Sequence, residues 1–183
     1  MTDVREALLV ELVTDLGDPI GSTTVEQAHA APGRLHRAFS VMILDDQGRV
    51  LLQQRAAVKT RFALRWANAC CGHPAPGTAV IDAATTRLRE ELGAGPVAMR
   101  EVGVYEYFAE DEASGRVEYE YDHVLLARVP ADGLDLAPDP AEVAATRWVA
   151  MADLVEELRD DPADFAPWLR GAVNLVLNHP EYR

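Results

Sequence analysis

Two short stretches of this 183-residue chain carry residues whose types and spacing suit chemistry. The first is the run from Asn68 to Pro74, with the letters NACCGHP, and the second is the pair Glu118 and Glu120. Residues two apart on an extended segment point to the same side, so Cys71 and His73 can reach one cavity, as can the two glutamates. Simpler interpretations stay open, because a free cysteine is often a packing group and such glutamates can form the solvated face of an edge strand.

Three histidines extend these stretches toward a metal site. His29 and His36 flank the entry to the first expected hairpin, and His73 follows the cysteine pair. Three imidazoles with the carboxylates of Glu118 and Glu120 would suit an ion of the Mn²⁺, Zn²⁺ or Mg²⁺ class. A lone histidine is more often structural or exposed than a ligand, and these residues come from four separated segments. The residues alone therefore leave the site open.

The chain is acidic, with 17 lysines and arginines, 30 aspartates and glutamates, and a formal net charge of −13. This balance opposes nucleic-acid binding, which needs a basic face. An anionic small molecule such as a diphosphate would need a local cationic patch or a bound metal. Four cations within eleven residues provide a candidate patch: Arg55, Lys59, Arg61 and Arg65.

Arg87 and Glu91 lie four residues apart in an expected helix. As functional residues, Arg87 would hold phosphate oxygens while Glu91 holds a phosphate-bridging Mg²⁺ ion. As structural residues, they would form a surface pair worth roughly a few tenths of a kcal/mol. Trp168 has two interpretations as well, since it can pack the C-terminal helix into the core or face a ligand.

Hydrophobic periodicity predicts a mixed α/β or α+β sandwich in one domain spanning residues 1–183. A short polar helix or loop is expected over 23–32, and helices over 79–92, 151–159 and 163–178. The expected strands span residues 4–14, 38–44, 49–54, 98–109, 117–129 and 147–149.

The remaining features of the chain narrow the protein class. No apolar run approaches the ~20 residues that span a bilayer, and the N-terminus does not read as a signal peptide. The two cysteines, Cys70 and Cys71, are adjacent and cannot form an ordinary disulfide framework. We therefore expect a cytoplasmic protein with reduced thiols and no membrane or nucleic-acid partner.

Six motifs together resemble type 1 isopentenyl-diphosphate Δ-isomerase, a family of the Nudix superfamily. The resemblance covers residues from about 5 to 178, and it implies a Nudix-like α/β/α sandwich with a mixed sheet. The motifs are RLHRAFS from Arg34, LLQQRA from Leu51, WANACCGHP from Trp66, RLREELG from Arg87, EYE from Glu118 and FAPW from Phe165.

The general Nudix hydrolase box, G-x₅-E-x₇-R-E-U-x-E-E-x-G-U, is only partly preserved. Aligned on Gly93, its final acidic pair matches Glu90 and Glu91, but two earlier glutamates are replaced by Thr78 and Arg87. A hydrolase uses those carboxylates to gather metals around the attacked diphosphate. Their loss argues against hydrolysis and suits an enzyme that binds a diphosphate without cleaving it.

The resemblance also implies a role for each candidate residue. Cys71 and Glu120 would be the acid–base pair, with Tyr107 hydrogen-bonded near Glu120. Glu91 would help to bind Mg²⁺ on the diphosphate, and Trp168 would face the hydrocarbon end. The implied ligands of a Mn²⁺, Mg²⁺ or Zn²⁺ ion are His29, His36, His73, Glu118 and Glu120, and the implied phosphate-binding residues are Arg55, Lys59 and Arg87. One departure is Val25, which stands where the family often has a lysine that contacts the diphosphate.

The implied reaction converts isopentenyl diphosphate to dimethylallyl diphosphate in isoprenoid biosynthesis, by protonation and deprotonation through a tertiary carbocation. The alternatives are a Nudix pyrophosphohydrolase that acts on a small diphosphate and a non-catalytic relative that only binds metal and diphosphate. The expected partner is the small-molecule substrate, and the expected state is a monomer or weak homodimer.

Overall fold

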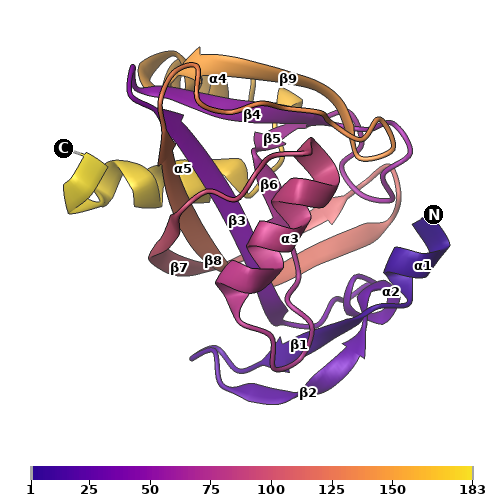
Figure 1. Ribbon diagram of the computed structural model, residues 1–183. Helices are drawn as coiled ribbons and strands as arrows, with labels where there is room; N and C mark the ends of the chain where they lie inside the picture. The colour runs from indigo at the N-terminus through magenta and orange to yellow at the C-terminus, as the bar shows by residue number, and fades with distance from the viewer. Residues whose placement is uncertain (1, 183) are drawn as a thin grey trace.

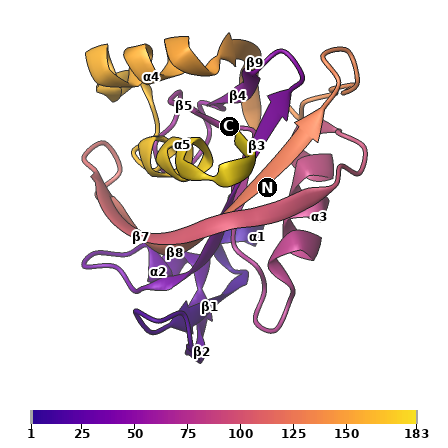
Figure 2. The same cartoon turned by 90° about the vertical axis from the view of Figure 1, so that its left-hand side faces the viewer.

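A computed structural model describes residues 2–182 of the chain. Across these residues nine strands form one mixed sheet, and helices cover both of its faces (Figures 1 and 2). The strands are β1 (Leu9–Val13), β2 (Pro19–Thr24), β3 (His36–Asp45), β4 (Arg49–Arg55), β5 (Trp66–Asn68), β6 (Cys70–Gly72), β7 (Met99–Asp111), β8 (Arg116–Val129) and β9 (Val143–Ala150). The helices are α1 (Thr2–Glu6), α2 (Val25–Ala28), α3 (Val80–Leu92), α4 (Met151–Asp160) and α5 (Leu169–Asn178), with 3₁₀ turns at Pro162–Asp164 and Pro180–Tyr182.

Strand β3 is the centre of the sheet. It pairs with β8 in parallel and with β1, β4 and β6 in antiparallel orientation, while β7 continues the sheet beyond β8 and β9 beyond β4. The register places His36 beside Glu120 and Ser40 beside Cys71. Residues that are far apart in the chain therefore meet along β3.

Alternate side chains of β3 enter two separate cores, as the period of a strand requires. Phe39, Val41 and Ile43 pack with Leu88 and other residues of α3. Met42 and Leu44 pack with α4 and α5 through residues such as Leu154, Leu169 and Val173. Helices α3 and α5 consequently lie on opposite faces of β3 (Figures 1 and 2), and the expected layered α/β architecture is confirmed.

Most expected elements are found, with longer bounds for several strands. The helix expected over 79–92 is α3, and Gly93 ends it in the left-handed conformation with a φ of 63°. The strand expected over 147–149 is β9, which begins at Val143. The short polar helix or loop expected over 23–32 contains the helix α2. The Thr24 hydroxyl caps its first turn and accepts a hydrogen bond from the Gln27 N–H.

Three expectations need correction. The strand expected over 4–14 is limited to β1, because the chain before it forms the helical turn α1 and the alternation of buried side chains begins only at Leu9. Strand β2 was not expected, since most of this polar edge strand is exposed and lacks an apolar pattern. The last helix begins at Leu169 rather than 163, because Pro167 lacks an N–H and interrupts the helical ladder.

Among residues 2–182, no helix has both the length and the apolar character needed to cross a membrane.

Gly171 in α5 provides a test of how tightly this helix packs on β7. A methyl group there would lie 2.6 Å from Cζ of the Tyr105 ring. Alanine favours a helix over glycine by about 1 kcal/mol, but overpacking typically costs about 1–3 kcal/mol. We expect Gly171→Ala to lower the free energy of unfolding in urea despite the better helix former. Gly95→Ala is the control, because nothing lies within 4 Å of the added methyl group there; equal effects in the two variants would contradict the packing argument.

Candidate active site

A cavity of about 500 Å³ opens between α1, the loop that joins β4 to β5, β6 and α3. It gathers most of the site residues expected from the sequence. The expected residues that line it are Arg55, Lys59, Cys71, His73, Arg87, Glu91, Tyr107, Glu118, Glu120 and Trp168. His29 and His36 lie fully buried behind its wall, and Arg65 of the expected cationic patch lines a separate shallow hollow beside Trp66.

The five expected metal ligands form one compact group. One ligand atom from each of His29, His36, His73, Glu118 and Glu120 lies within 4.8 Å of every other. The chain delivers them from the end of α2, the start of β3, the residue after β6 and strand β8. Since this group contains three imidazoles and two carboxylates, it is compatible with a divalent cation.

The backbone orients two of these imidazoles toward the group. Nδ1 of His29 lies 2.6 Å from the carbonyl oxygen of Val25, and Nδ1 of His36 lies 2.7 Å from that of Arg34. A carbonyl accepts only from an N–H, so each Nδ1 carries a proton and each Nε2 points to the other ligands. This is the second-nitrogen hydrogen bond that metal-bound histidines typically make.

The buried ligand atoms require positive charge among them. Nε2 of His29 lies 2.8 Å from Oε2 of Glu118, and among residues 2–182 neither atom has another hydrogen-bond partner. Burial alone would lower the pKa of His29, but the carboxylates of Glu118 and Glu120 outweigh it and raise this pKa to about 9. A lone pair facing a carboxylate is repulsive, so a proton or a metal ion has to lie between them. The donor atoms therefore fit a divalent ion.

The inner end of the cavity joins a thiol, a carboxylate and aromatic rings. Tyr107 donates a hydrogen bond from its hydroxyl to Glu120, and its ring centroid lies 6.2 Å from that of Trp168. The Cys71 thiol donates to Oδ1 of Asn68 at 3.1 Å. Burial raises the pKa of this thiol to about 12, with a further contribution from the Asp122 carboxylate. The thiol is thus protonated and held in place.

The outer end of the cavity holds cations that carboxylates already engage. Lys59 Nζ lies 2.6 Å from Oε2 of Glu142, and Arg87 pairs with Glu91, Glu90 and the same oxygen of Glu142. Glu91 also accepts a hydrogen bond from the Gln53 amide at 2.8 Å. An incoming anion would have to take over these cations from the carboxylates.

Arg55 has a different environment from Lys59 and Arg87. Its guanidinium donates to the backbone carbonyls of Arg61 and Phe62 and lies over the Trp168 ring, with 5.2 Å between Cζ and the ring centroid. In this structure it braces the loop between β4 and β5 and the aromatic wall.

Comparisons with known proteins agree with this arrangement. Residues 34–169 match the model of the NUDIX domain. A protein of Nocardia farcinica named isopentenyl-diphosphate Delta-isomerase is 56% identical over 91% of this chain and 93% of its own length. Proteins of the same name from Streptomyces coelicolor and Halorhodospira halophila are 47% and 41% identical, over 89% and 88% of this chain and 80% and 90% of theirs. The chain belongs to the Nudix isopentenyl-diphosphate Delta-isomerase family.

Solved structures support the fold. The crystal structure of a Deinococcus radiodurans protein superposes on this chain with a TM-score of 0.72 at 15% sequence identity. The superposition covers 91% of this chain and 98% of that protein's chain. A MutT NUDIX hydrolase from Burkholderia pseudomallei has a TM-score of 0.58 at 20% identity, over 78% of this chain and 98% of its own. The expected Nudix-like sandwich with a mixed sheet is confirmed.

In this chain, one glutamate position of the Nudix hydrolase box is occupied by an arginine. Arg87 stands at a glutamate position of the hydrolase box and binds the two remaining acidic residues, Glu90 and Glu91. The box thereby has one carboxylate fewer and one cation more than the hydrolase pattern.

Two residues of the isomerase cavity were not assigned a role from the sequence. Asn68 is fully buried and joins Cys71 to Trp168, because its Oδ1 accepts from the thiol and from the indole Nε1 at 3.0 Å. Glu142 gathers Arg5, Lys59 and Arg87. Asn68 lies in the same run as Cys71 and could have been predicted as a site residue, whereas no sequence pattern points to Glu142.

Asn68 offers a test of this inner hydrogen-bond network. Its Nδ2 also donates to the carbonyl oxygens of Val41 and Cys70. Asn68→Ala would leave several buried groups unpaired, and each such group typically costs about 1–3 kcal/mol. We expect a loss of at least about 2 kcal/mol in the free energy of unfolding, measured by denaturant titration. Gln54→Ala is the matched control, because it removes one exposed amide contact to Leu64; a similar loss there would contradict the assignment.

Proposed function

We propose that this chain converts isopentenyl diphosphate to dimethylallyl diphosphate and that Cys71 and Glu120 carry the proton transfers. The observation that carries this proposal is the two-ended cavity. Its inner end presents the thiol of Cys71 and the carboxylate of Glu120 beside aromatic rings, and its outer end presents Lys59 and Arg87. A small molecule with a hydrocarbon tail and a diphosphate head matches both ends.

The outer end binds the diphosphate. Lys59 and Arg87 provide charge-assisted hydrogen bonds to phosphate oxygens, and Arg55 lies within reach of the same cavity. Glu91 is 4% exposed and would help to hold a Mg²⁺ ion bound to the diphosphate. The diphosphate serves as the handle that positions the tail.

The inner end performs the chemistry on the hydrocarbon tail. An alkene is a very weak base, so its acid has to lie against it in a site that excludes water. One of the two groups, Cys71 or Glu120, delivers a proton to the terminal carbon, which gives a tertiary carbocation. The other removes a proton from the neighbouring carbon on the opposite face, and the double bond moves by one position without any loss of phosphate.

Aromatic side chains stabilise the positive intermediate. Trp168 is 3% exposed and lies beside Tyr107 and Phe62, with ring centroids 6.2 Å and 5.6 Å away. A cation over the face of a tryptophan gains about 2 kcal/mol or more when it is desolvated. Tyr107, through its hydrogen bond to Glu120, also fixes the position of that carboxylate.

A resident divalent ion completes the site. The residues that would hold it are His29, His36, His73, Glu118 and Glu120. We propose Mn²⁺, Mg²⁺ or Zn²⁺, which differ in preferred geometry but all accept imidazole or carboxylate ligands. When bound, the ion supplies fixed positive charge that sets the position and acidity of Glu120.

The reaction itself is tested by turnover in D₂O. The protein with Mg²⁺ and isopentenyl diphosphate should yield dimethylallyl diphosphate that carries deuterium, because the added proton comes from a group that exchanges with solvent. No inorganic phosphate or monophosphate should appear. Release of either product would favour a pyrophosphohydrolase, and binding without turnover would favour a non-catalytic relative.

The role of Cys71 is tested against its neighbour. Cys71→Ala should reduce turnover by about 10²–10⁴-fold or more, the usual range for a lost acid–base group, while sparing metal content. Cys70→Ala is the control, because this thiol is fully buried and its Sγ contacts the Cys71 carbonyl oxygen rather than the cavity. Equal activity in the two variants would refute the assignment.

A further inference from the structure

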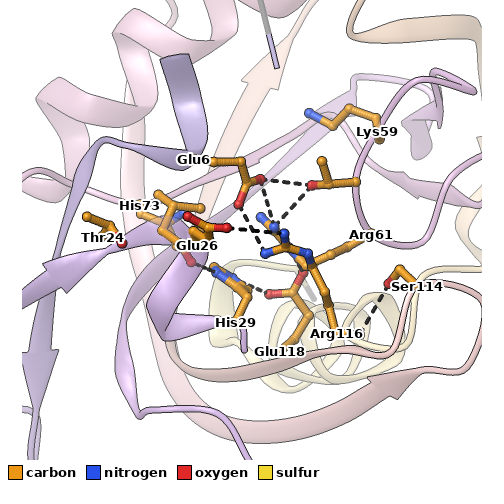
Figure 3. Close-up of polar contacts among 12 residues, drawn as sticks. Glu6, Thr24, Glu26, His29, Lys59, Arg61, His73, Ser114, Arg116 and Glu118 are labelled. Atoms are coloured by element: carbon orange, nitrogen blue, oxygen red, sulfur yellow. Dashed lines mark hydrogen bonds and ion pairs between the residues drawn. The ribbon is translucent and has the colours of Figure 1, made fainter. Parts of the chain in front are cut away.

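Arg61 has no role in the proposed reaction, although its side chain reaches the cavity wall. It is 8% exposed and lies in the loop between β4 and β5. Its Nε donates to Oε1 of Glu118 at 3.0 Å, and its Nη1 donates to Oε1 of Glu6 at 3.0 Å and to the Thr60 hydroxyl at 3.1 Å (Figure 3). Both sides of the guanidinium are therefore occupied by carboxylates, so Arg61 is not aimed at a diphosphate.

Because Arg61 binds one oxygen of Glu118, the two oxygens of this carboxylate have different partners. Oε1 is bound by Arg61, whereas Oε2 faces Nε2 of His29 at 2.8 Å (Figure 3). Glu118 is itself 4% exposed, so water contributes little to its position. One oxygen is anchored by a buried cation, and the other is left pointing into the group of metal ligands.

We propose that Arg61 is a positioning residue for the resident metal ion, which it serves by holding the Glu118 carboxylate in its binding orientation. The inference rests on the metal site of the proposed function. It adds a residue of the β4–β5 loop to a site otherwise built from the end of α2, β3, β6 and β8.

Two effects of Arg61 on metal binding oppose each other. Its positive charge repels a cation, but its hydrogen bond orients a ligand. Glu6 offsets only part of that charge, because its carboxylate accepts a hydrogen bond from Arg61 but is shared with Arg116 at 3.4 Å. We expect the orienting effect to be the larger one, because loss of a partner that orients a ligand typically costs 10- to 100-fold in metal affinity.

A purely structural role would be to fasten α1 to the rest of the protein through Glu6. Other contacts also attach helix α1 to the protein. The Thr60 hydroxyl donates a hydrogen bond to Glu6 at 2.9 Å, and Arg5 pairs with Glu142 at 2.9 Å. That role predicts a lower unfolding temperature with unchanged metal affinity. Metal affinity therefore separates the two roles.

The test measures Mn²⁺ affinity in substrate-free protein by electron paramagnetic resonance, together with the unfolding temperature of each variant. We expect Arg61→Ala to bind Mn²⁺ about 10- to 100-fold more weakly than wild type. Arg116→Ala is the matched control, because Arg116 also pairs with Glu6, and its ion pairs in the described part of the chain are with Glu6 and Glu26 rather than Glu118. This variant should stay within about 3-fold of wild type, below the range expected for a lost orienting partner. Unchanged or tighter binding in Arg61→Ala, or equal weakening in the two variants, would overturn the proposal.

Two further variants address charge and folding. The double variant Glu6→Gln with Arg61→Ala keeps the net charge of wild type, so weak binding should persist if orientation is the cause, and recovery to wild-type affinity would count against it. If Arg61→Ala does not fold, Arg61→Lys decides, because one ammonium cannot reproduce a fork that contacts two carboxylates. A folded Arg61→Lys protein with wild-type affinity would reject the proposal.

A variant of an expected ligand separates this proposal from the proposed function. His73→Ala should remove the strong Mn²⁺ site of the wild type. If the wild type has no such site, or keeps it in His73→Ala, the metal site itself is wrong. If the site behaves as expected and Arg61→Ala leaves it intact, only the role of Arg61 is rejected.

Discussion

The pairing of β3 with both β8 and β6 brings the histidine, glutamate and cysteine side chains of the candidate site together. The parallel pairing of β8 sets His36 beside Glu120, and the antiparallel pairing of β6 on the same strand sets Cys71 beside Ser40. A slip of one residue would turn the glutamates of β8 to the other face, because side chains alternate along a strand. The register is protected by burial, since β3 packs apolar side chains into cores on both faces. The stability of the two cores and the geometry of the site therefore share one cause.

Charge compensation explains how so acidic a chain can bind an anionic substrate. The cations around the cavity are engaged by carboxylates, as in the pairs of Lys59 with Glu142 and of Arg87 with Glu91. In the proposed function, a diphosphate with its Mg²⁺ would bring charges of both signs. Its phosphate oxygens would replace the carboxylates at the cations, and the carboxylates would turn to the metal. Net charge thus governs the long-range field, whereas binding depends on these local exchanges.

The sequence predicted the elements and residues whose signals are local, and it missed those that depend on tertiary contacts. Helix α3 was predicted because one short segment contains both its helical apolar period and Gly93, which ends it. The five candidate metal ligands were grouped by their residue types, but no spacing rule joins four distant segments, so the sequence pointed to a metal site only with the help of the resemblance. Glu142 and the orienting contact of Arg61 arise only when a loop folds against β8 or α3, so a single sequence could not reveal them.

The same fold that supports hydrolysis in other Nudix proteins here suits chemistry on carbon. Arg87 replaces a box carboxylate and binds Glu90 and Glu91. In the proposed function, the outer end therefore holds a diphosphate rather than assembling metals for attack on phosphorus. The acid–base candidates instead lie at the inner end, where Tyr107 contacts Glu120 and packs together with Trp168 and Cys71. A carbocation survives only where water is excluded and negative or aromatic groups face it. In the proposed function, the division between a charged outer end and an aromatic inner end is therefore the physical basis on which this fold binds a diphosphate at one end and reacts at the other end of the molecule.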